Sequence, residues 1–253
     1  MVDCIIQARM GSTRFPKKIL QNINSTKKVL EFLIDQLKYS KKIDKIIIAT
    51  TILEEDDVIE ELCEKIQIKC FRGDAKNVLD RYYQCAKAFG INEIMRITSD
   101  CPLIDPRLID QGVEKFENKD YDYVENSQGD FPHGLDFCIF RFNDLENAWK
   151  NAKLPSEQEH VIPYILKNIE QKKYFNFQSE KNLSKIRITL DYPEDLELLR
   201  MVVSQIKSRP ILLNDIITLF EKNPKLLKIN SGHVKDEGYL KSLEDDKKFL
   251  GKK

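Results

Sequence analysis

The sequence predicts an α/β protein with a Rossmann-like, mostly parallel sheet flanked by helices. The first observation is that short apolar segments alternate with segments of helical periodicity through the first hundred residues or so. The second is that a strand-like segment such as residues 45–50 is apolar on both faces, as expected where helices cover both sides of a sheet. The third is the composition, because 42% hydrophobic and 32% charged residues over 253 residues are typical of a soluble globular protein.

The first half of the chain has the pattern of successive βαβ units. We expect strands over residues 3–8, 45–50, 68–71 and 93–98, and helices over residues 29–39, 56–65 and 77–89. Ligands bind such sheets beyond the carboxyl ends of the strands, where the loops converge. A site is therefore expected in the loops that follow Ala8, Thr50, Phe71 and Thr98.

The second half contains a small inserted strand and loop region and a helical C-terminus. The expected elements are, in order, a helix from Pro106, strands over 121–124 and 136–140, a helix from Ser156 through Ile169, a strand over 186–190 and a helix from Pro193. Proline is favoured in the first turn of a helix, and SEQE at residues 156–159 has the form of a capping box. Lys, Asp and Glu dominate after Ser231, so we expect one domain over residues 1–230 and a charged tail over 231–253, as a solvated surface helix or frayed terminus.

Charge and cysteine content exclude several classes of protein. Lys+Arg and Asp+Glu both total 41, so the chain lacks the long-range positive field of a general nucleic-acid binder or membrane-surface protein. No segment resembles a membrane span or a signal peptide, which predicts a cytoplasmic protein. The six cysteines show no C-x-x-C spacing, so we expect packing residues, Cys101 included, instead of disulfides or a zinc site.

The loop after the first expected strand is rich in groups that bind phosphate. Residues 9–18, RMGSTRFPKK, contain a glycine, two hydroxyl side chains and four cations. Gly11 allows the backbone to approach an anion closely, and arginine can hold a polyphosphate with two hydrogen bonds. The loop matches neither the P-loop nor the dinucleotide-binding glycine pattern. It is therefore either a triphosphate cradle or an ordinary basic surface loop.

Two aspartates follow expected strands and are candidates for binding a metal ion. Asp100 follows the strand over 93–98, and Asp191 follows the strand over 186–190. Proteins usually hold Mg²⁺ with one or two carboxylates together with phosphate oxygens of the substrate. Alternatively, each aspartate caps a turn or the helix that follows it. Asp195 is expected to serve the N-terminus of the next helix, where negative charge is favourable.

Several ordered motifs resemble the cytidylyltransferases that make CMP-sugars, including CMP-Kdo synthetase. The opening motif is CIIQARMGSTRFPKKIL, and SDCPLIDP and LDYPEDLELL look like the two metal-aspartate motifs of that superfamily. With NVLDRYY, HGLDF and EHVIPYI, the set resembles most closely the spore coat polysaccharide biosynthesis branch. The resemblance is strongest over residues 1–205 and implies the fold of the nucleotide-diphospho-sugar transferases.

The resemblance also implies roles for individual residues. Nucleotide binding falls to Ala8, Arg9, Gly11, Ser12, Arg14, Lys18, Asp80 and Arg81, and the catalytic residues are Arg14, Lys18 and Asp100. Asp100 and Asp191 would hold Mg²⁺, with Mn²⁺ as an alternative ion. The acceptor would contact His133, Gly134, Asp136, Glu159 and His160.

A few positions remain open within the resemblance. Lys17 and Ser99 stand where relatives usually have glycine, although neither change removes an implied ligand. Only Asp80 and Arg81 match the turn that relatives place near cytosine, so base recognition is less well supported than phosphate binding. His160 is either an acceptor ligand or a structural histidine at a helix terminus.

Together the motifs predict a Mg²⁺-dependent nucleotidyltransferase. An oxygen of an acidic sugar or sugar phosphate would attack the α-phosphorus of CTP, pyrophosphate would leave, and the CMP-sugar would supply surface polysaccharide or glycan biosynthesis. The expected partners are CTP and the small acceptor, with neither nucleic acid nor membrane, and homodimerisation is left open. The alternative is a glycosyltransferase or a noncatalytic nucleotide-sugar binding protein. Asp120 and Asp122 have the Asp-x-Asp spacing of a glycosyltransferase, but a solvated turn is the simpler explanation.

Overall fold

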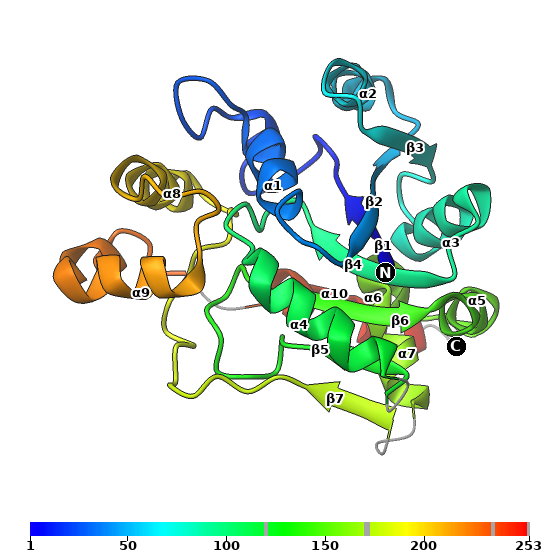
Figure 1. Cartoon of the computed structure of the whole chain (residues 1–253). Helices are drawn as coiled ribbons and strands as arrows, with labels where there is room; N and C mark the ends of the chain where they lie inside the picture. Colours follow the sequence, from blue (N-terminus) through cyan, green and yellow to red (C-terminus); the bar gives the residue numbers. More distant parts are fainter. Residues whose placement is uncertain (119–120, 170–172, 234–235, 252–253) are drawn as a thin grey trace.

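The computed structural model describes residues 1–118, 121–169, 173–233 and 236–251. These residues form a seven-stranded sheet in the order β3-β2-β1-β4-β6-β5-β7 (Figure 1). The strands are β1 Val2–Gln7, β2 Ile43–Thr51, β3 Lys69–Gly73, β4 Glu93–Thr98, β5 Tyr123–Glu125, β6 Phe137–Arg141 and β7 Tyr174–Asn176. Strands β1 to β4 are parallel, β6 runs antiparallel to both of its neighbours, and β7 is parallel to β5. The predicted mostly parallel sheet is confirmed.

The strand order reverses between β1 and β4. From β1 the chain adds β2 and then β3 on one side, whereas β4 returns to the other side of β1. Gln7 at the end of β1 pairs with Thr98 at the end of β4, so the loops that follow these strands begin side by side. In open α/β sheets, such a reversal leaves a crevice for ligands at the carboxyl ends of the strands.

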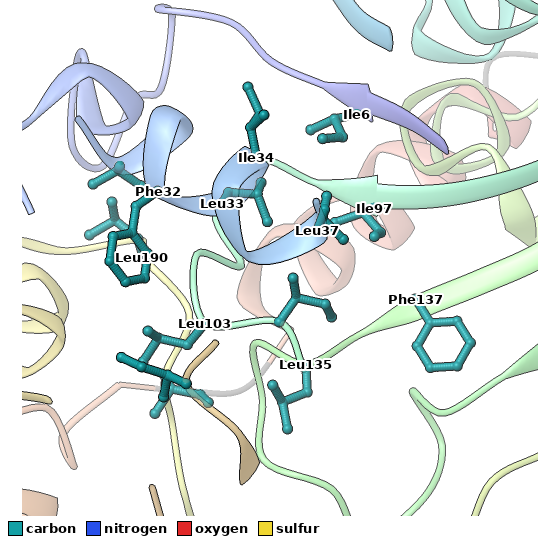
Figure 2. Close-up of a cluster of buried hydrophobic side chains, with 14 of the residues drawn as sticks. Ile6, Phe32, Leu33, Ile34, Leu37, Ile97, Leu103, Leu135, Phe137 and Leu190 are labelled. Carbon is teal, nitrogen blue, oxygen red and sulfur yellow. The ribbon is translucent and has the colours of Figure 1, made fainter. Parts of the chain in front are cut away.

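Helices cover both faces of the sheet (Figure 1). They are α1 Val29–Leu37, α2 Asp57–Lys65, α3 Val78–Phe89, α4 Pro106–Glu117, α5 Phe142–Asn151, α6 Pro155–His160, α7 Ile162–Asn168, α8 Pro193–Gln205, α9 Leu213–Lys222 and α10 Glu237–Leu250. Because side chains alternate along a strand, Ile5 and Ile94 pack with α3, α5 and α7, whereas Ile6 and Ile97 pack with α1, α4 and α8. Figure 2 shows part of this second apolar layer, with Leu37 of α1 close to Ile97. Among the described residues, no helix combines the length and apolar character needed to cross a membrane.

Residues 186–190 do not form the predicted strand of the sheet. The segment is extended and makes one isolated bridge to His133. At its other end, the Leu190 N–H donates to the carbonyl oxygen of Asp100 at 2.8 Å. The apolar pattern that predicted a strand arises because the segment is buried between two loops. These loops supply the backbone hydrogen-bond partners that a neighbouring strand would otherwise supply. As a result, Asp191 lies beside Asp100.

The predicted helix over residues 156–169 is interrupted and forms the two helices α6 and α7. Val161 separates them with a φ of 69°. Pro163 explains the break, because a proline inside a helix lacks the N–H for the i−4 hydrogen bond and clashes with the preceding turn. The capping box is also displaced, since Glu157 accepts a hydrogen bond from the N–H of Leu154 at 3.0 Å.

The charged C-terminal segment forms α10, which packs on α6. Asp246 of α10 is buried and accepts hydrogen bonds from the N–H and the hydroxyl group of Ser156, at 2.9 and 2.5 Å. The His160 ring lies 2.9 Å from the hydroxyl of Ser242 and edge-on to Tyr239, with ring centroids 5.1 Å apart. The segment thus forms a surface helix, as one of the two expectations had it, and most of its side chains are exposed. Polar side chains on one face of this helix bind α6.

The structure predicts that Gly134→Ala destabilises the protein. Gly134 has a φ of 110°, and a Cβ atom there would lie 2.5 Å from the backbone nitrogen of Thr189 and 2.6 Å from the carbonyl carbon of Ile188. Backbone atoms cannot move aside as a flexible side chain can, so the free energy of unfolding in urea should fall by about 1–3 kcal/mol. Gly232→Ala is the matched control, because a Cβ at Gly232 meets nothing within 4 Å. Unchanged stability of Gly134→Ala would contradict this close backbone approach.

Candidate functional site

The loop after β1 is fixed to the short 3-10 helix η2, Glu54–Asp56, which follows β2. The Met10 N–H donates to Asp56 Oδ1 at 2.7 Å, and Asp56 is fully buried. The Lys17 N–H donates back to the Met10 carbonyl oxygen at 3.1 Å. These hydrogen bonds fold the loop over the sheet and end it at the short 3-10 helix η1, Lys18–Leu20. The side chain of Lys18 is thereby buried at the end of the sheet.

Lys18 lies between the two predicted metal-binding aspartates. Its Nζ atom is 3.0 Å from Asp100 Oδ2 and 2.9 Å from Asp191 Oδ1. Arg14 also donates to Asp191 Oδ1, at 2.6 Å. The structure thus brings together side chains from three separate sequence motifs at the point where the strand order reverses.

Ion pairing keeps these side chains charged. Burial lowers the pKa of Lys18, but the carboxylates of Asp100 and Asp191 outweigh burial and raise the pKa overall. Burial likewise raises the pKa of Asp100, whereas Lys18 and hydrogen bonding outweigh it and hold this pKa well below its ordinary value. The pKa of Arg14 is raised, because Asp191 and Glu237 outweigh its partial burial. Arg14, Lys18 and Asp100 are therefore all ionised at neutral pH.

A second ion-pair cluster orients Asp191. Arg187 donates to Asp191 Oδ2 at 3.1 Å and to the two carboxylate oxygens of Asp195 at 2.8 and 2.9 Å. Asp195 is fully buried and also accepts from the N–H groups of Asp191 and Tyr192, at 2.8 and 3.0 Å. Burial would raise the pKa of Asp195, but these partners lower it. Asp195 therefore serves the N-terminus of α8, as predicted.

A cavity of about 910 Å³ opens beside this cluster, within the size range of small-molecule sites. Of the predicted nucleotide-binding residues, those that line it are Ala8, Arg9, Gly11, Ser12, Arg14, Lys18 and Arg81. Asp100 lines it as well, and Gln7 and Arg96 of the sheet contribute to its lining. Helices α6 and α10 supply further lining residues.

Asp80 is the predicted nucleotide-binding residue that does not line the cavity. Its Oδ1 atom accepts from Trp149 Nε1 at 2.8 Å and from Gln84 Nε2 at 3.0 Å. Successive residues of a helix project in different directions, so the next residue, Arg81, lines the cavity while Asp80 contacts α5. Burial and the neighbouring charge of Arg9 lower the pKa of Arg81.

Two of the predicted acceptor residues line the cavity next to the nucleotide loop. Glu159 accepts a hydrogen bond from Arg9 at 2.7 Å, and His160 follows it at the end of α6. Burial, together with the positive charges of Arg96 and Arg9, lowers the pKa of His160 to about 4. The His160 ring is therefore neutral at physiological pH. The contacts of His160 with Ser242 and Tyr239 of α10 also give it a structural role.

The other predicted acceptor residues, His133, Gly134 and Asp136, do not line the cavity. His133 Nδ1 lies 3.1 Å from Arg187 Nη1, and the Gly134 N–H donates to Asp136 Oδ2 at 2.9 Å. The missing side chain of Gly134 leaves room for the backbone of residues 188–189. This loop thus supports Arg187, and through it the orientation of Asp191.

Residues of α10 also line the cavity, although no sequence motif identifies them as site residues. Glu237 Oε2 accepts from Arg14 Nη1 at 3.3 Å and from the hydroxyl group of Tyr192. The Arg14 guanidinium lies over the Tyr192 ring, 5.4 Å from its centroid. Arg14 therefore divides its donors between Asp191 and Glu237. An acidic residue in the first turn of a helix is common, so the sequence alone gives no signal for this contact.

The donor chemistry of Asp100 and Asp191 fits a divalent ion that the substrate helps to bind. In the described part of the chain, no group of three or more His, Cys, Asp and Glu side chains could hold a metal ion. Mg²⁺ needs only one or two protein carboxylates when phosphate oxygens and waters complete its octahedron. Both aspartates direct an oxygen at the same cation, Lys18, so the pair suits Mg²⁺ or Mn²⁺ together with a phosphorylated substrate.

Other candidate groups do not join the site. All six cysteines are free thiols, and burial raises the pKa of Cys101 well above its ordinary value, so it stays an unreactive thiol at neutral pH. Asp120 lies outside the described residues. Asp122 pairs with Arg141 and, at 3.1 Å, with Lys173, and it does not line the cavity.

Known proteins resemble this chain in sequence and in fold. A family model described as cytidylyltransferase matches residues 4–223. An uncharacterized protein of Methanocaldococcus jannaschii is 40% identical over 237 residues, which are 93% of this chain and 96% of that protein. The spore coat polysaccharide biosynthesis protein SpsF of Bacillus subtilis is 32% identical over 230 residues, 87% and 94% of the two chains. A 3-deoxy-manno-octulosonate cytidylyltransferase of Thermodesulfovibrio yellowstonii is 25% identical over 228 residues, 81% and 87% of the two chains.

Among solved structures, a cytidylyltransferase from Leptospira borgpetersenii has a TM-score of 0.85 and 36% sequence identity, and the match covers 92% of this chain and 98% of that one. The predicted resemblance to cytidylyltransferases and to the spore coat polysaccharide branch is thereby confirmed. On the family model, the relatives and the fold together, the chain belongs to the cytidylyltransferase family.

Proposed function

We propose that this chain transfers CMP from CTP to an acidic sugar or sugar phosphate and releases pyrophosphate. The observation that carries the proposal is the position of Lys18 between Asp100 and Asp191, next to the basic loop and the cavity. The family description supports a cytidylyl donor, and the octulosonate in one relative's name supports an acidic acceptor. The name of the Bacillus relative supports a product that supplies polysaccharide biosynthesis.

The basic loop is proposed to bind the triphosphate. Arg14 pairs with both Asp191 and the exposed Glu237, so it can exchange a carboxylate for phosphate oxygens and remain paired. Lys18 stays between Asp100 and Asp191 and adds its positive charge beside the loop. Gly11 and Ser12 line the cavity next to them. Arginine holds a phosphate through two N–H groups and lysine acts as a point charge, so the pair would stabilise the leaving pyrophosphate.

The reaction forms a bond between an acceptor oxygen and the α-phosphorus while the bond to the bridging oxygen of the pyrophosphate breaks. Asp100 and Asp191 would hold Mg²⁺, or Mn²⁺, which neutralises charge on the phosphate oxygens when it is bound. Lys18 keeps the two carboxylates next to each other, and Arg187 and Asp195 fix the orientation of Asp191. Positioning and charge neutralisation dominate such transfers, because the protein does little covalent chemistry itself.

The acceptor is proposed to bind on the side of Asp100 that faces the loop of His133 and Asp136. His133 contacts Arg187, which pairs with Asp191 beside Asp100. Glu159 and His160 lie instead beside Arg9, and we assign them to the nucleoside side of the cavity. This assignment separates the two substrates on either side of β4.

The reaction itself is tested by incubating the protein with CTP, UTP, ATP or GTP, Mg²⁺ and a panel of acidic sugars and sugar phosphates. Pyrophosphate release with CTP and at least one acceptor is the expected result. Consumption of a CMP-sugar or UDP-sugar without pyrophosphate release would favour the glycosyltransferase alternative. Binding of a nucleotide sugar without turnover would favour a noncatalytic binding protein.

Asp100→Asn is expected to lower kcat for pyrophosphate release by about 100-fold or more, because it removes a charge that the transition state requires. The affinity for CTP in the absence of metal should change much less. Asp110→Asn is the control, since this carboxylate binds Ser40 and Lys41 and does not line the cavity. Normal kcat with an unchanged Mg²⁺ dependence in Asp100→Asn would show that Asp100 is not a metal ligand.

Arg14→Ala is expected to weaken CTP binding by about 10- to 100-fold, as for the loss of one or two charge-assisted hydrogen bonds. The KM of the acceptor should change little, because the proposal places Arg14 on the triphosphate. Isothermal titration calorimetry with CTP and steady-state kinetics with the acceptor measure the two effects. Arg200→Ala serves as the control, since Arg200 donates to the Asn22 carbonyl oxygen outside the cavity. A larger effect on the acceptor than on CTP would refute the assignment of the loop.

Glu237→Gln is expected to strengthen CTP binding by about two- to five-fold at low salt, because it frees Arg14 from a competing exposed carboxylate. The gain should shrink at high salt, where exposed ion pairs are screened. Glu221→Gln removes another exposed charge, from a distant pair with Lys181, and should leave CTP binding unchanged. Weaker CTP binding by Glu237→Gln would indicate that Glu237 helps to bind the nucleotide instead of competing with it.

A further inference from the structure

Arg96 is a cation at the cavity to which the proposed function gives no role. It lies on β4, and its side chain is on the face of the sheet that carries Ile94 and α3. It lines the cavity next to Gln7, whose Oε1 atom accepts a hydrogen bond from Arg96 at 2.9 Å. The Nε atom of Arg96 is buried and has no hydrogen-bond partner among the described residues.

The other guanidinium groups at this end of the cavity are already occupied. Arg9 is paired with Glu159, and Arg81 donates to two backbone carbonyl oxygens. Arg96 forms no ion pair with a carboxylate in the part of the chain that the structure describes, and it lies 5.8 Å from the ring centroid of Tyr82. A cation that lines a cavity without a counter-charge is a suitable partner for the acceptor atoms of a ligand. Among the described residues, Arg96 is therefore a guanidinium at the cavity that no carboxylate neutralises.

The position of Arg96 favours the base of the nucleotide over the acceptor as its ligand. Gln7, its partner, directly precedes the phosphate-binding loop, and the first turn of α3 lines the same end of the cavity. The loop of His133 packs instead with residues 186–190, whose apolar side chains belong to the layer on the opposite face of the sheet. A nucleotide held by the basic loop thus has its base end within reach of Arg96.

Cytosine and uracil differ at the atoms that a guanidinium can recognise. Cytosine presents two adjacent acceptors, O2 and N3, whereas N3 of uracil carries a hydrogen and is a donor. A guanidinium presents paired N–H donors that match two adjacent acceptors, as arginine does with guanine in DNA. The Oε1 atom of Gln7 is an acceptor beside Arg96 and complements the amino group that cytosine carries next to N3.

We propose, resting on the function proposed above, that Arg96 donates hydrogen bonds to N3 and O2 of cytosine and makes this chain select CTP over UTP. Gln7 holds the guanidinium in place and acts as a positioning residue. Base specificity then comes from Gln7 on β1 and Arg96 on β4, whereas the loop that follows β1 binds the phosphates.

The test compares the affinities of CTP, UTP and 3-deaza-CTP, in which a C–H group replaces N3, by isothermal titration calorimetry. The wild type should bind CTP about 10-fold or more tightly than either analogue, because both lack the N3 acceptor. Arg96→Lys keeps the charge but loses the paired donors, so CTP should bind about 10-fold more weakly while UTP and 3-deaza-CTP change by less than about two-fold. Arg141→Lys is the matched control, an arginine on the neighbouring strand β6 that does not line the cavity.

Several results would overturn this proposal. Equal affinity of the wild type for CTP and 3-deaza-CTP would do so without any variant, so the test does not depend on the folding of Arg96→Lys. Equal losses of CTP and UTP affinity in Arg96→Lys would show that the guanidinium contacts a group that both nucleotides share, and it would overturn the selection of cytosine by Arg96. A raised acceptor KM with unchanged nucleotide affinities would assign it to the anionic group of the acceptor.

The same measurements separate this inference from the proposed function. Selective CTP binding that Arg96→Lys abolishes, without pyrophosphate release for any acceptor, would support the role of Arg96 while the transfer reaction fails. Pyrophosphate release from CTP and UTP at equal efficiency would support the transfer reaction and overturn the role of Arg96. A wild-type protein that binds no CTP would overturn both.

Discussion

The buried ammonium group of Lys18 is the constraint on which the rest of the site depends. Breaking a buried ion pair by removing one partner costs about 3–5 kcal/mol, so a lysine in this position requires fixed counter-charges. Asp100 and Asp191 supply them from two distant segments, and they can do so only because β4 lies next to β1 and because residues 186–190 run against the loop after β4. The strand order, the loop that contains Gly134 and the start of α8 all help to hold Lys18 between Asp100 and Asp191.

The ion pairs of the site differ in how easily a bound substrate could replace one of the partners. Arg14 shares its donors between Asp191 and the exposed Glu237, so an incoming anion replaces one partner at small cost. Asp195 is instead enclosed by Arg187 and by backbone N–H groups, which makes the orientation of Asp191 a property of the fold. The site therefore combines a rigid centre of Lys18, Asp100 and Asp191 with one cation, Arg14, that can change partners. Helix α10 closes over this arrangement from outside the segment that the family model matches.

Much of the fold follows from local patterns in the sequence. The strands and helices through β4 agree closely with the predicted segments, because their two-sided apolar runs and helical periodicities are strong and regular. Elements with weaker patterns are missed: α5 and α9 have no distinctive start signal, and β7 is a three-residue strand. The segment over 186–190 is wrongly predicted as a strand of the sheet, since a buried extended segment has the same apolar pattern whether its backbone bonds to a strand or to loops. The break at Val161 could have been anticipated from Pro163.

The chemical groups of the site can be read from the chain alone: a basic glycine-containing loop after the first strand and two aspartates in motifs that resemble those of cytidylyltransferases. Strand ends and turn residues are local features, so Arg14, Lys18 and Asp100 could be placed near one sheet edge from the chain alone. Three features follow only from the folded chain: Asp80 faces away from the cavity, Glu237 of α10 pairs with Arg14, and Arg96 lines the cavity without a carboxylate partner among the described residues. These features depend on the direction of each side chain and on partners that are distant in the sequence. A sequence pattern indicates that a residue is buried or charged, but it does not indicate which residue lies opposite it.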